Sequence, residues 1–258
     1  MLTAIDFLRY QIKAGNAHGL HSPYVFKLFT DVIEPYKHYY AFDEIEALRT
    51  ALLEDNTKLK VTDFGAGSKK LKSKERKVKD IAKNSLSSQK VGELLFKLVA
   101  YLKPKEVIEL GTCLGISTLY LAKVSPDVHI TTFEGCPIQM DVAESIFKST
   151  GADNITTIQG NLDETLGPFL SQKNKVDFVY FDANHRYEPT VRYFETFLPY
   201  KHEETVFVFD DIHWSNGMRK AWEKIKCHPE VKITIDLFQV GLVLFRDKQP
   251  KQDFTLLF

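Results

Sequence analysis

Three aspartates and one histidine in the second half of the chain are the residues best suited to chemistry. Asp182 and His185 belong to the segment Asp-Ala-Asn-His, and Asp210 and Asp211 are adjacent. Each group follows an apolar run typical of a buried strand, and the parallel strands of an open α/β sheet place such residues at one edge. Carboxylates gathered at one edge repel one another, so a bound cation would stabilise them.

A divalent cation and a histidine at that edge could activate a hydroxyl group. Carboxylate oxygens favour a hard ion such as Mg²⁺, and a hydroxyl bound to the ion has a lowered pKa. We therefore predict Asp182, Asp210 and Asp211 as metal ligands, Asp182 and His185 as catalytic residues, and His185 as the general base. Alternatives stay open: Asp182 could hold the amino group of a cofactor, Asp211 could cap the next helix, and His185 could only hydrogen-bond a carboxylate.

A second segment, Glu106–Tyr120, combines an apolar run with two glycines in E-V-I-E-L-G-T-C-L-G-I-S-T-L-Y. The run predicts a buried strand, Gly111 and Gly115 predict a tight turn, and the apolar residues after them have helical spacing. Such a unit offers backbone N–H groups to a ligand. The dinucleotide fingerprint G-x-G-x-x-G is not met, because Cys113 stands in place of its middle glycine.

The string E-L-G-x-x-x-G-x-S-T within this segment resembles motif I of class I methyltransferases, which use S-adenosylmethionine (SAM). It is nearest to the motif of small-molecule O-methyltransferases, and the resemblance covers roughly residues 91–246. It implies that the glycines let the backbone approach the methionine part of SAM and that the acid at position 109 supports the turn. The predicted cofactor-binding residues are Glu109, Gly111, Thr112, Gly115, Ser117, Glu134, Asn161 and Asp163.

Glu134 ends the second predicted strand, where an acid can accept hydrogen bonds from both ribose hydroxyls of an adenosine. SAM and NAD share that ribose, so Glu134 does not distinguish between them, and it could also cap the next helix. The segment Gly160-Asn161-Leu162-Asp163 resembles the one that brackets adenine in the family, although Asn and Asp also cap helices.

The acidic segments carry a resemblance too. Asp-x-x-His followed by Asp-Asp resembles the metal-dependent O-methyltransferases of macrolide sugars, and the pattern of catechol O-methyltransferase is similar, with Asp211 in place of an asparagine. The implied cofactors are SAM and Mg²⁺, and the implied partner is a small-molecule hydroxyl acceptor, whose pocket His213 and Trp214 could line. An RNA ribose methyltransferase and an NAD-linked oxidoreductase are the alternatives. The segment Asp-Ala-Asn-His lacks the Pro-Pro-aromatic string of enzymes that methylate base amino groups, which disfavours nucleic-acid bases.

Strands and helices alternate after residue 88, which predicts an α/β fold. The expected strands are 107–110, 128–133, 155–159, 176–181, 206–209, 231–237 and 241–246. The last two are joined by too few residues for a helical crossover and should pair antiparallel. We predict a Rossmann-like, doubly wound, mostly parallel seven-stranded sheet with an antiparallel terminal hairpin.

Residues 1–87 are predicted to form an N-terminal helical extension with a basic, lid-like segment, and residues 88–258 a SAM-binding methyltransferase domain. Ser22-Pro23 and Asp43-Glu44-Ile45-Glu46 are typical helix starts. Residues 61–68 mimic the strand and glycine turn, but residues 69–79 lack a helical apolar pattern. We interpret 69–79 as a basic surface segment, which could close over an acidic ligand, contact RNA, or simply be solvated.

Composition limits the remaining possibilities. The chain has 34 Lys and Arg against 34 Asp and Glu, so net charge does not argue for nucleic acid or a membrane. Its three cysteines have no paired spacing, which excludes a Cys-rich zinc site and suits a reducing compartment. There is no long apolar run and no signal-peptide pattern, so we expect a soluble, cytoplasmic protein. The oligomeric state cannot be predicted.

Overall fold

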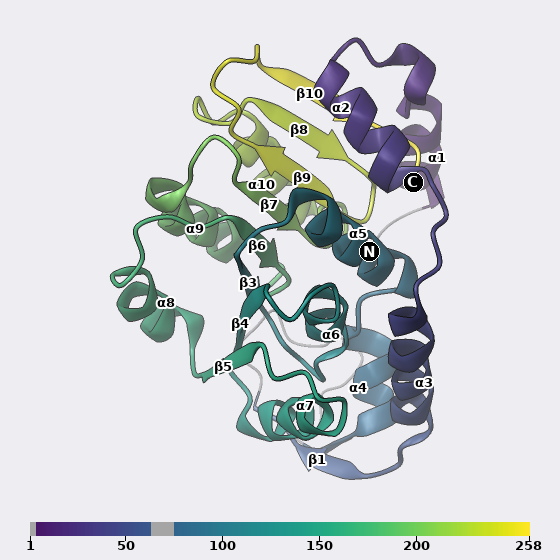
Figure 1. The fold of residues 1–258 in the computed structure, drawn as a ribbon, viewed down its shortest axis with the longest axis vertical. Coiled ribbons are helices and arrows are strands. Elements are labelled where there is room, and N and C mark those ends of the chain that lie inside the picture. The colour runs from purple at the N-terminus through teal and green to yellow at the C-terminus, as the bar shows by residue number, and fades with distance from the viewer. Residues whose placement is uncertain (1–3, 63–74) are drawn as a thin grey trace. The chain divides into compact units, whose positions relative to one another are not determined.

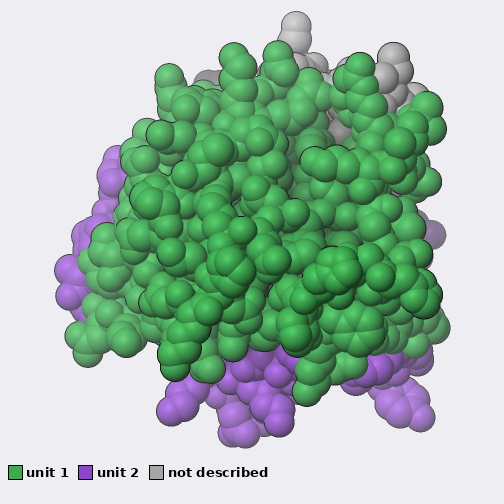
Figure 2. All heavy atoms as spheres, turned by 90° about the horizontal axis from the view of Figure 1, so that it is seen from above, with its two compact units in different colours: residues 1–36, 173–258 green, residues 37–172 purple. Residues whose placement is uncertain are grey.

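The computed structural model describes residues 4–62 and 75–258, which divide into two compact units (Figures 1 and 2). One unit comprises Met1–Tyr36 and Lys173–Phe258, and the other comprises Lys37–Gln172. Most of the predicted glycine-turn mimic, and positions 69–74 of the predicted basic segment, lie outside the described residues. Compactness alone does not define a folding domain, so the boundary predicted after residue 87 stays a prediction.

The unit Lys37–Gln172 has a parallel sheet of β3 (Glu106–Leu110), β4 (His129–Glu134) and β5 (Ile155–Gln159), in that order. Strand β3 has no polar–apolar alternation because every residue from Val107 to Leu110 is buried, as expected of an inner parallel strand. The helices that follow the strands are α6 (Ile116–Ala122), α7 (Pro137–Ser149) and α8 (Leu162–Leu170). Helix α6 contacts β4, and α7 contacts both β4 and β5 (Figure 1).

The same unit begins with α3 (Tyr40–Glu54), a ribbon of β1 (Lys58–Lys60) and β2 (Glu75–Lys77), α4 (Val78–Ser85) and α5 (Gln89–Leu102). Helix α3 starts before the predicted capping box, and Asp43 instead accepts a 3.0 Å bond from His38 within its first turn. The prediction of a plain surface segment is wrong for residues 75–79, since β2 pairs with β1 and Val78 is buried. Val78, Ile81 and Ala82 have helical spacing, and burial of that face outweighs the surrounding lysines.

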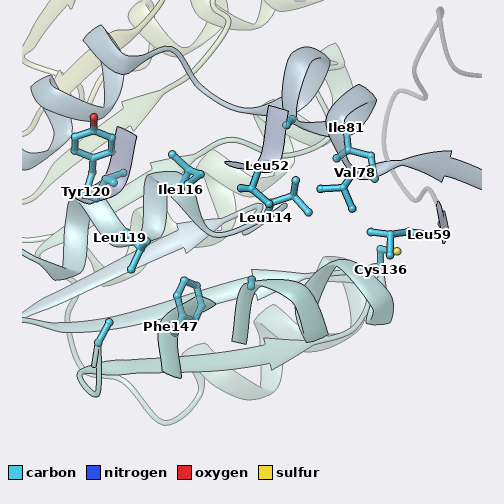
Figure 3. Packing of buried hydrophobic residues seen from close by; sticks show 14 of the residues in the cluster. Leu52, Leu59, Val78, Ile81, Leu114, Ile116, Leu119, Tyr120, Cys136 and Phe147 are labelled. Atoms are coloured by element: carbon cyan, nitrogen blue, oxygen red, sulfur yellow. The ribbon is translucent and has the colours of Figure 1, made fainter. Parts of the chain in front are cut away.

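A single apolar core holds these helices in place (Figure 3). Leu52 from α3, Ile81 from α4 and Leu119 from α6 belong to one cluster of buried side chains, together with Phe147 from α7. Figure 3 also shows Leu114, from the turn after β3, within this cluster. Leu114 therefore anchors the turn to this core.

The other unit has strands in the order β10-β8-β9-β7-β6. Their bounds are β6 (Phe178–Phe181), β7 (Val206–Phe209), β8 (Ile233–Asp236), β9 (Gly241–Leu244) and β10 (Gln252–Thr255). Strands β6 and β7 are parallel, and β8 and β9 form the predicted antiparallel hairpin. The α/β fold with a mostly parallel sheet is confirmed. Strand β10 was not predicted, because this edge strand lacks the apolar run that marks buried strands.

The helices of this unit are α1 (Ala4–Lys13), α2 (Pro23–Leu28), α9 (Tyr187–Phe197) and α10 (Asn216–Lys226), with short turns η1 (Ala17–Gly19), η2 (Phe29–Ile33) and η3 (Leu198–Tyr200). The predicted helix start at Ser22 is confirmed, since its hydroxyl accepts a bond from the Val25 N–H. The start of the chain is tied to its end, with Gly15 N–H donating to the Thr255 carbonyl at 2.9 Å (Figure 1). No helix within residues 4–62 and 75–258 is long and apolar enough to cross a bilayer.

Candidate active site

The glycine turn after β3 is where the sequence places it. Gly111 and Gly115 have φ angles of 106° and 84°, and Cys113 between them has φ 51°. The N–H groups of Gly111 and Thr112 each donate to the Phe133 carbonyl at 3.0 Å, which holds the turn against the end of β4. Left-handed backbone at a non-glycine residue costs free energy and often marks a functional loop.

Glu109 braces this turn from inside the protein. Its Oε2 accepts hydrogen bonds from the hydroxyls of Thr118 and Thr132, the latter at 2.7 Å. The Thr132 hydroxyl lies 2.6 Å from that of Thr112, so one network links β3, the turn, α6 and β4. Because the side chains of Glu109 and Thr112 are fully buried, the turn presents its backbone to a ligand.

Glu134, the last residue of β4, hydrogen-bonds to the same turn. Its Oε2 accepts the Cys113 N–H at 2.9 Å, and its Oε1 accepts the Cys136 N–H at 2.8 Å. Cys136 is the N-cap of α7, so Glu134 also helps to cap this helix, as the alternative interpretation of Glu134 expected. A carboxylate oxygen accepts more than one hydrogen bond, so both oxygens still have capacity for ribose hydroxyls.

The other predicted cofactor residues lie at helix starts. Asn161 caps α8, its side-chain oxygen accepting the Asp163 N–H at 3.2 Å. Gly160 before it has φ 142°. Ser117 is buried in the first turn of α6. Their roles toward SAM stay predictions.

Gly115→Ala is expected to lower the free energy of unfolding by roughly 2–4 kcal/mol. The added Cβ would lie 2.6 Å from the Phe147 ring and 3.2 Å from Ala143, at a residue with φ 84°. Urea denaturation checks this, with Gly167→Ala as the control, because a Cβ at Gly167 meets nothing within 4 Å. Equal stability of Gly115→Ala and the parent would show that the turn tolerates a side chain.

The acidic groups of the unit that contains residues 173–258 do come together. Asp182 follows β6 and Asp210 follows β7, and the Asp210 N–H donates to the Phe181 carbonyl at 3.0 Å. His185 lies between two carboxylates, with Nε2 3.4 Å from Asp182 Oδ1 and Nδ1 4.0 Å from Asp211 Oδ2. Asn184 and Asp211 have φ angles of 58° and 55°, so strained backbone marks both loops.

The electrostatics of this cluster favour a protonated histidine. Burial lowers the pKa of His185, but its hydrogen bond to Asp182 and the charges of Asp182 and Asp211 outweigh burial and raise the pKa above 6.5. Its side chain is 24% exposed, so it is accessible to a substrate. Burial and the charge of Asp182 raise the pKa of Asp211, while the charge of His185 opposes them.

Asp210 is the most buried of the acids, at 4% exposure. Burial, followed by the charges of Asp182 and Asp211, raises its pKa well above the ordinary value, and it hydrogen-bonds with Asp182. Its Oδ1 has no hydrogen-bond partner among the described residues. Burial and the two neighbouring carboxylates therefore both favour the neutral form of Asp210.

The predicted metal site is not shown. Within the described part of the chain, no group of three or more His, Cys, Asp and Glu side chains is arranged to hold a metal ion. Asp182, Asp210 and Asp211 lie near one another, and Asp210 is buried and hydrogen-bonded to Asp182.

Comparison with known proteins identifies the domain. The family model Methyltransf_24, a methyltransferase domain, matches residues 108–212, a segment that contains every predicted site residue. Residues 108–212 are thus similar to a methyltransferase domain. A catechol O-methyltransferase of Mycobacterium tuberculosis is 27% identical over 146 residues, which cover 54% of this chain and 62% of that protein.

A probable protein arginine N-methyltransferase 1.2 of Arabidopsis thaliana is 24% identical over 161 residues, covering 57% of this chain and 42% of that protein. The chain thus spans less than two thirds of either curated relative. The O-methyltransferase of Bacillus cereus, solved in complex with SAH, has the same fold: TM-score 0.57, 20% identity, covering 86% of this chain and 97% of that one.

The two residues predicted to line the acceptor pocket, His213 and Trp214, have different surroundings. The Trp214 ring lies 6.0 Å from that of His185, beside the acidic cluster. His213 instead donates or accepts a 2.7 Å hydrogen bond with Asp236 and stacks on Phe238, at 5.5 Å. Trp214 therefore fits the predicted pocket lining better than His213. The sequence analysis did not predict Asp236 as a site residue. Asp236 is the last residue of β8, in a position similar to those of Asp182 after β6 and Asp210 after β7.

Asp210→Asn should raise the melting temperature at pH 8, by about 2–4 °C for each kcal/mol gained. Folding raises the pKa of Asp210 above its unfolded value, 3.8. Asp210 therefore contributes most to the free energy of unfolding below pH 3.8, and this contribution is lost as the pH rises through the pKa of the folded state. Asparagine has no charge to bury and can donate to Asp182 as the acid does. The gain should vanish near pH 4.

Melting curves in EDTA from pH 4 to pH 8 measure this effect, with the exposed Asp247→Asn as the matched control. A pH-independent difference between Asp210→Asn and the parent would mean that Asp210 is ionised in the folded protein.

Proposed function

We propose that the protein is a SAM-dependent methyltransferase that methylates a hydroxyl oxygen of a small molecule. The observation that supports this most is His185, held by Asp182 and Asp211 next to Trp214 in a methyltransferase domain. A histidine with carboxylate partners is suited to removing a hydroxyl proton, which an oxygen nucleophile needs.

The cofactor is proposed to bind at the glycine turn and Glu134. The turn has left-handed backbone at Gly111, Cys113 and Gly115, which lets the main chain approach a ligand closely. Glu134 is partly exposed at the end of β4 and is fixed in place by two backbone N–H groups. A fixed carboxylate can accept both ribose hydroxyls without first losing side-chain freedom.

The proposed reaction has one covalent step. Neutral His185 accepts the proton of the acceptor hydroxyl, and the oxygen attacks the methyl carbon of SAM in line with the departing sulfur. The C–S bond breaks, the O–CH₃ bond forms, and the sulfonium becomes the neutral thioether of S-adenosylhomocysteine (SAH). Asp182 and Asp211 stabilise the imidazolium that results.

Magnesium at Asp182, Asp210 and Asp211 stays a prediction, and no step of the proposed reaction passes through it. An ion there would supply charge to lower the pKa of the acceptor hydroxyl. The buried Oδ1 of Asp210 is an oxygen that such an ion could take, and the ion would bind the ionised form of that carboxyl group.

Incubation with ¹³C-methyl SAM and catechol, as a small hydroxyl probe, tests the proposal. We expect one labelled methyl group on an oxygen of the probe and one SAH released per product in MgCl₂, and a parallel reaction in EDTA shows whether the metal is required. A rate that vanishes in EDTA would support the metal prediction instead. Label found only on RNA or on arginine of a protein substrate would contradict a small-molecule acceptor, and NADH formation from NAD⁺ would contradict methyl transfer altogether.

A further inference from the structure

We propose that Cys113 and Cys136 form a redox-responsive thiol pair that a hydroperoxide converts to a disulfide, weakening cofactor binding at the glycine turn. The effect on the cofactor rests on the proposed function, whereas the disulfide itself does not. Both residues belong to the same compact unit, and the structure holds both as thiols.

The two cysteines lie in the loops that follow neighbouring parallel strands. Strands β3 and β4 are parallel, and their paired residues, such as Glu109 and Thr132, are separated by 23 positions. Cys113 and Cys136 have the same separation and follow the ends of these strands. Neighbouring parallel strands lie about 4.8 Å apart, within the range of Cα separations, about 4.4–6.8 Å, that a disulfide spans.

One carboxylate keeps the two residues together beyond the strand ends. The Cys113 N–H donates to Glu134 Oε2 at 2.9 Å and the Cys136 N–H donates to Glu134 Oε1 at 2.8 Å. The two backbones are therefore bridged through a single side chain. This shared carboxylate keeps the two loops close to each other beyond the paired strands.

Both cysteines lie at the start of α7, one as its N-cap and the other through a side-chain contact with its first turn. Cys136 is the N-cap of α7, and its Sγ accepts the Thr62 N–H at 3.3 Å. Cys113 Sγ accepts a bond from Gln139 in the first turn of α7, at 3.6 Å. Cys113 is partly exposed while Cys136 is buried, so a small oxidant reaches Cys113 first.

The chemistry balances in two steps. The Cys113 thiolate attacks one oxygen of the hydroperoxide, which breaks the O–O bond and gives a sulfenic acid plus water or an alcohol. The Cys136 thiol then attacks the sulfenic sulfur, its proton leaves with the departing hydroxyl as water, and the S–S bond forms. Two thiols are oxidised, and one peroxide is reduced.

The bond would disturb the residues that the proposed cofactor site uses. Cys113 lies at φ 51° inside the turn, and its N–H is one of two that orient Glu134. Pulling Cys113 toward α7 shifts both the turn backbone and that carboxylate. Losing one hydrogen bond to a charged group corresponds to about tenfold or more in affinity.

The experiment uses the full-length protein treated with hydrogen peroxide, digested without reduction and mapped by mass spectrometry. The expected product is a linked pair of peptides that contain Cys113 and Cys136, which dithiothreitol separates. In calorimetry, SAH should bind oxidised protein about tenfold or more weakly than reduced protein. The exposed Cys227 is the internal control, and Cys227→Ala should respond as the parent does.

Cys136→Ser should show the same SAH affinity before and after peroxide, because no disulfide can form. Peptides in which only Cys227 is oxidised, or a Cys113–Cys136 disulfide that leaves SAH affinity unchanged, would overturn the proposal. If reduced protein does not bind SAH at all, the proposed methyltransferase function fails, and the peptide map still decides whether the thiol pair exists.

Discussion

Replacing His185 with alanine is expected to lower the rate of methyl transfer by about 10²–10⁴-fold, with SAM affinity nearly unchanged. The loss follows from removing the group that accepts the acceptor proton, while none of the residues proposed to bind SAM is replaced. Single-turnover rates with catechol as the probe and calorimetry with SAH measure the two quantities separately.

The pH profile gives the same prediction a second readout. His185 acts as a base only when neutral, and its pKa is raised above 6.5, so the rate should rise with pH through a value above 6.5. Asp182→Asn removes the carboxylate that raises this pKa most, so the rising limb should move to lower pH.

His202→Ala is the matched control for both measurements. His202 also pairs with an aspartate, its Nε2 lying 3.1 Å from Asp177 Oδ1, and its side chain is exposed to a similar degree, 22%. It lies away from the strand ends that carry Asp182 and Asp210. Activity of His185→Ala equal to that of His202→Ala would remove His185 from the mechanism.

Glu134→Gln is expected to weaken SAH binding by roughly 10- to 100-fold. The amide has one acceptor oxygen for the two N–H donors, Cys113 and Cys136, that the carboxylate now satisfies. Its NH₂ group would face one of those donors, and the ribose hydroxyls would lose a charged acceptor. Calorimetry at several temperatures measures the change in affinity.

The exposed Glu54→Gln serves as the control for the loss of one negative charge. Melting curves without ligand show whether Glu134→Gln is folded at the temperature of the titration, because its cap on α7 is weakened too. An unchanged SAH affinity in folded Glu134→Gln would restrict Glu134 to its capping role.

Much of the fold could be predicted because buried strands appear in the sequence as continuous apolar runs. The apolar run Val107–Leu110 predicts an inner parallel strand, and Val206–Phe209 does the same. Strand β10 could not be found in this way, since its residues Gln252–Thr255 are partly exposed at a sheet edge. Helix α4 was hidden because lysines surround the three apolar residues that it buries.

The site could be predicted in its residue types and less well in its bonds. The position of Glu134 after β4 follows from sequence, but its hold on the Cys113 and Cys136 N–H groups depends on how two loops meet. The shared hydrogen bond of Asp182 and Asp210 depends likewise on burial, which sequence spacing does not specify. Repulsion among carboxylates predicts that something neutralises them, and a proton satisfies that condition as well as a metal does.

Isothermal titration of the protein with SAH and, separately, with NAD⁺ tests the central claim most directly. The account predicts a saturable heat for SAH with one site per chain, none for NAD⁺, and a weakened SAH isotherm for Glu134→Gln. Saturable binding of NAD⁺ without binding of SAH would contradict the claim that the glycine turn and Glu134 hold a methyl donor.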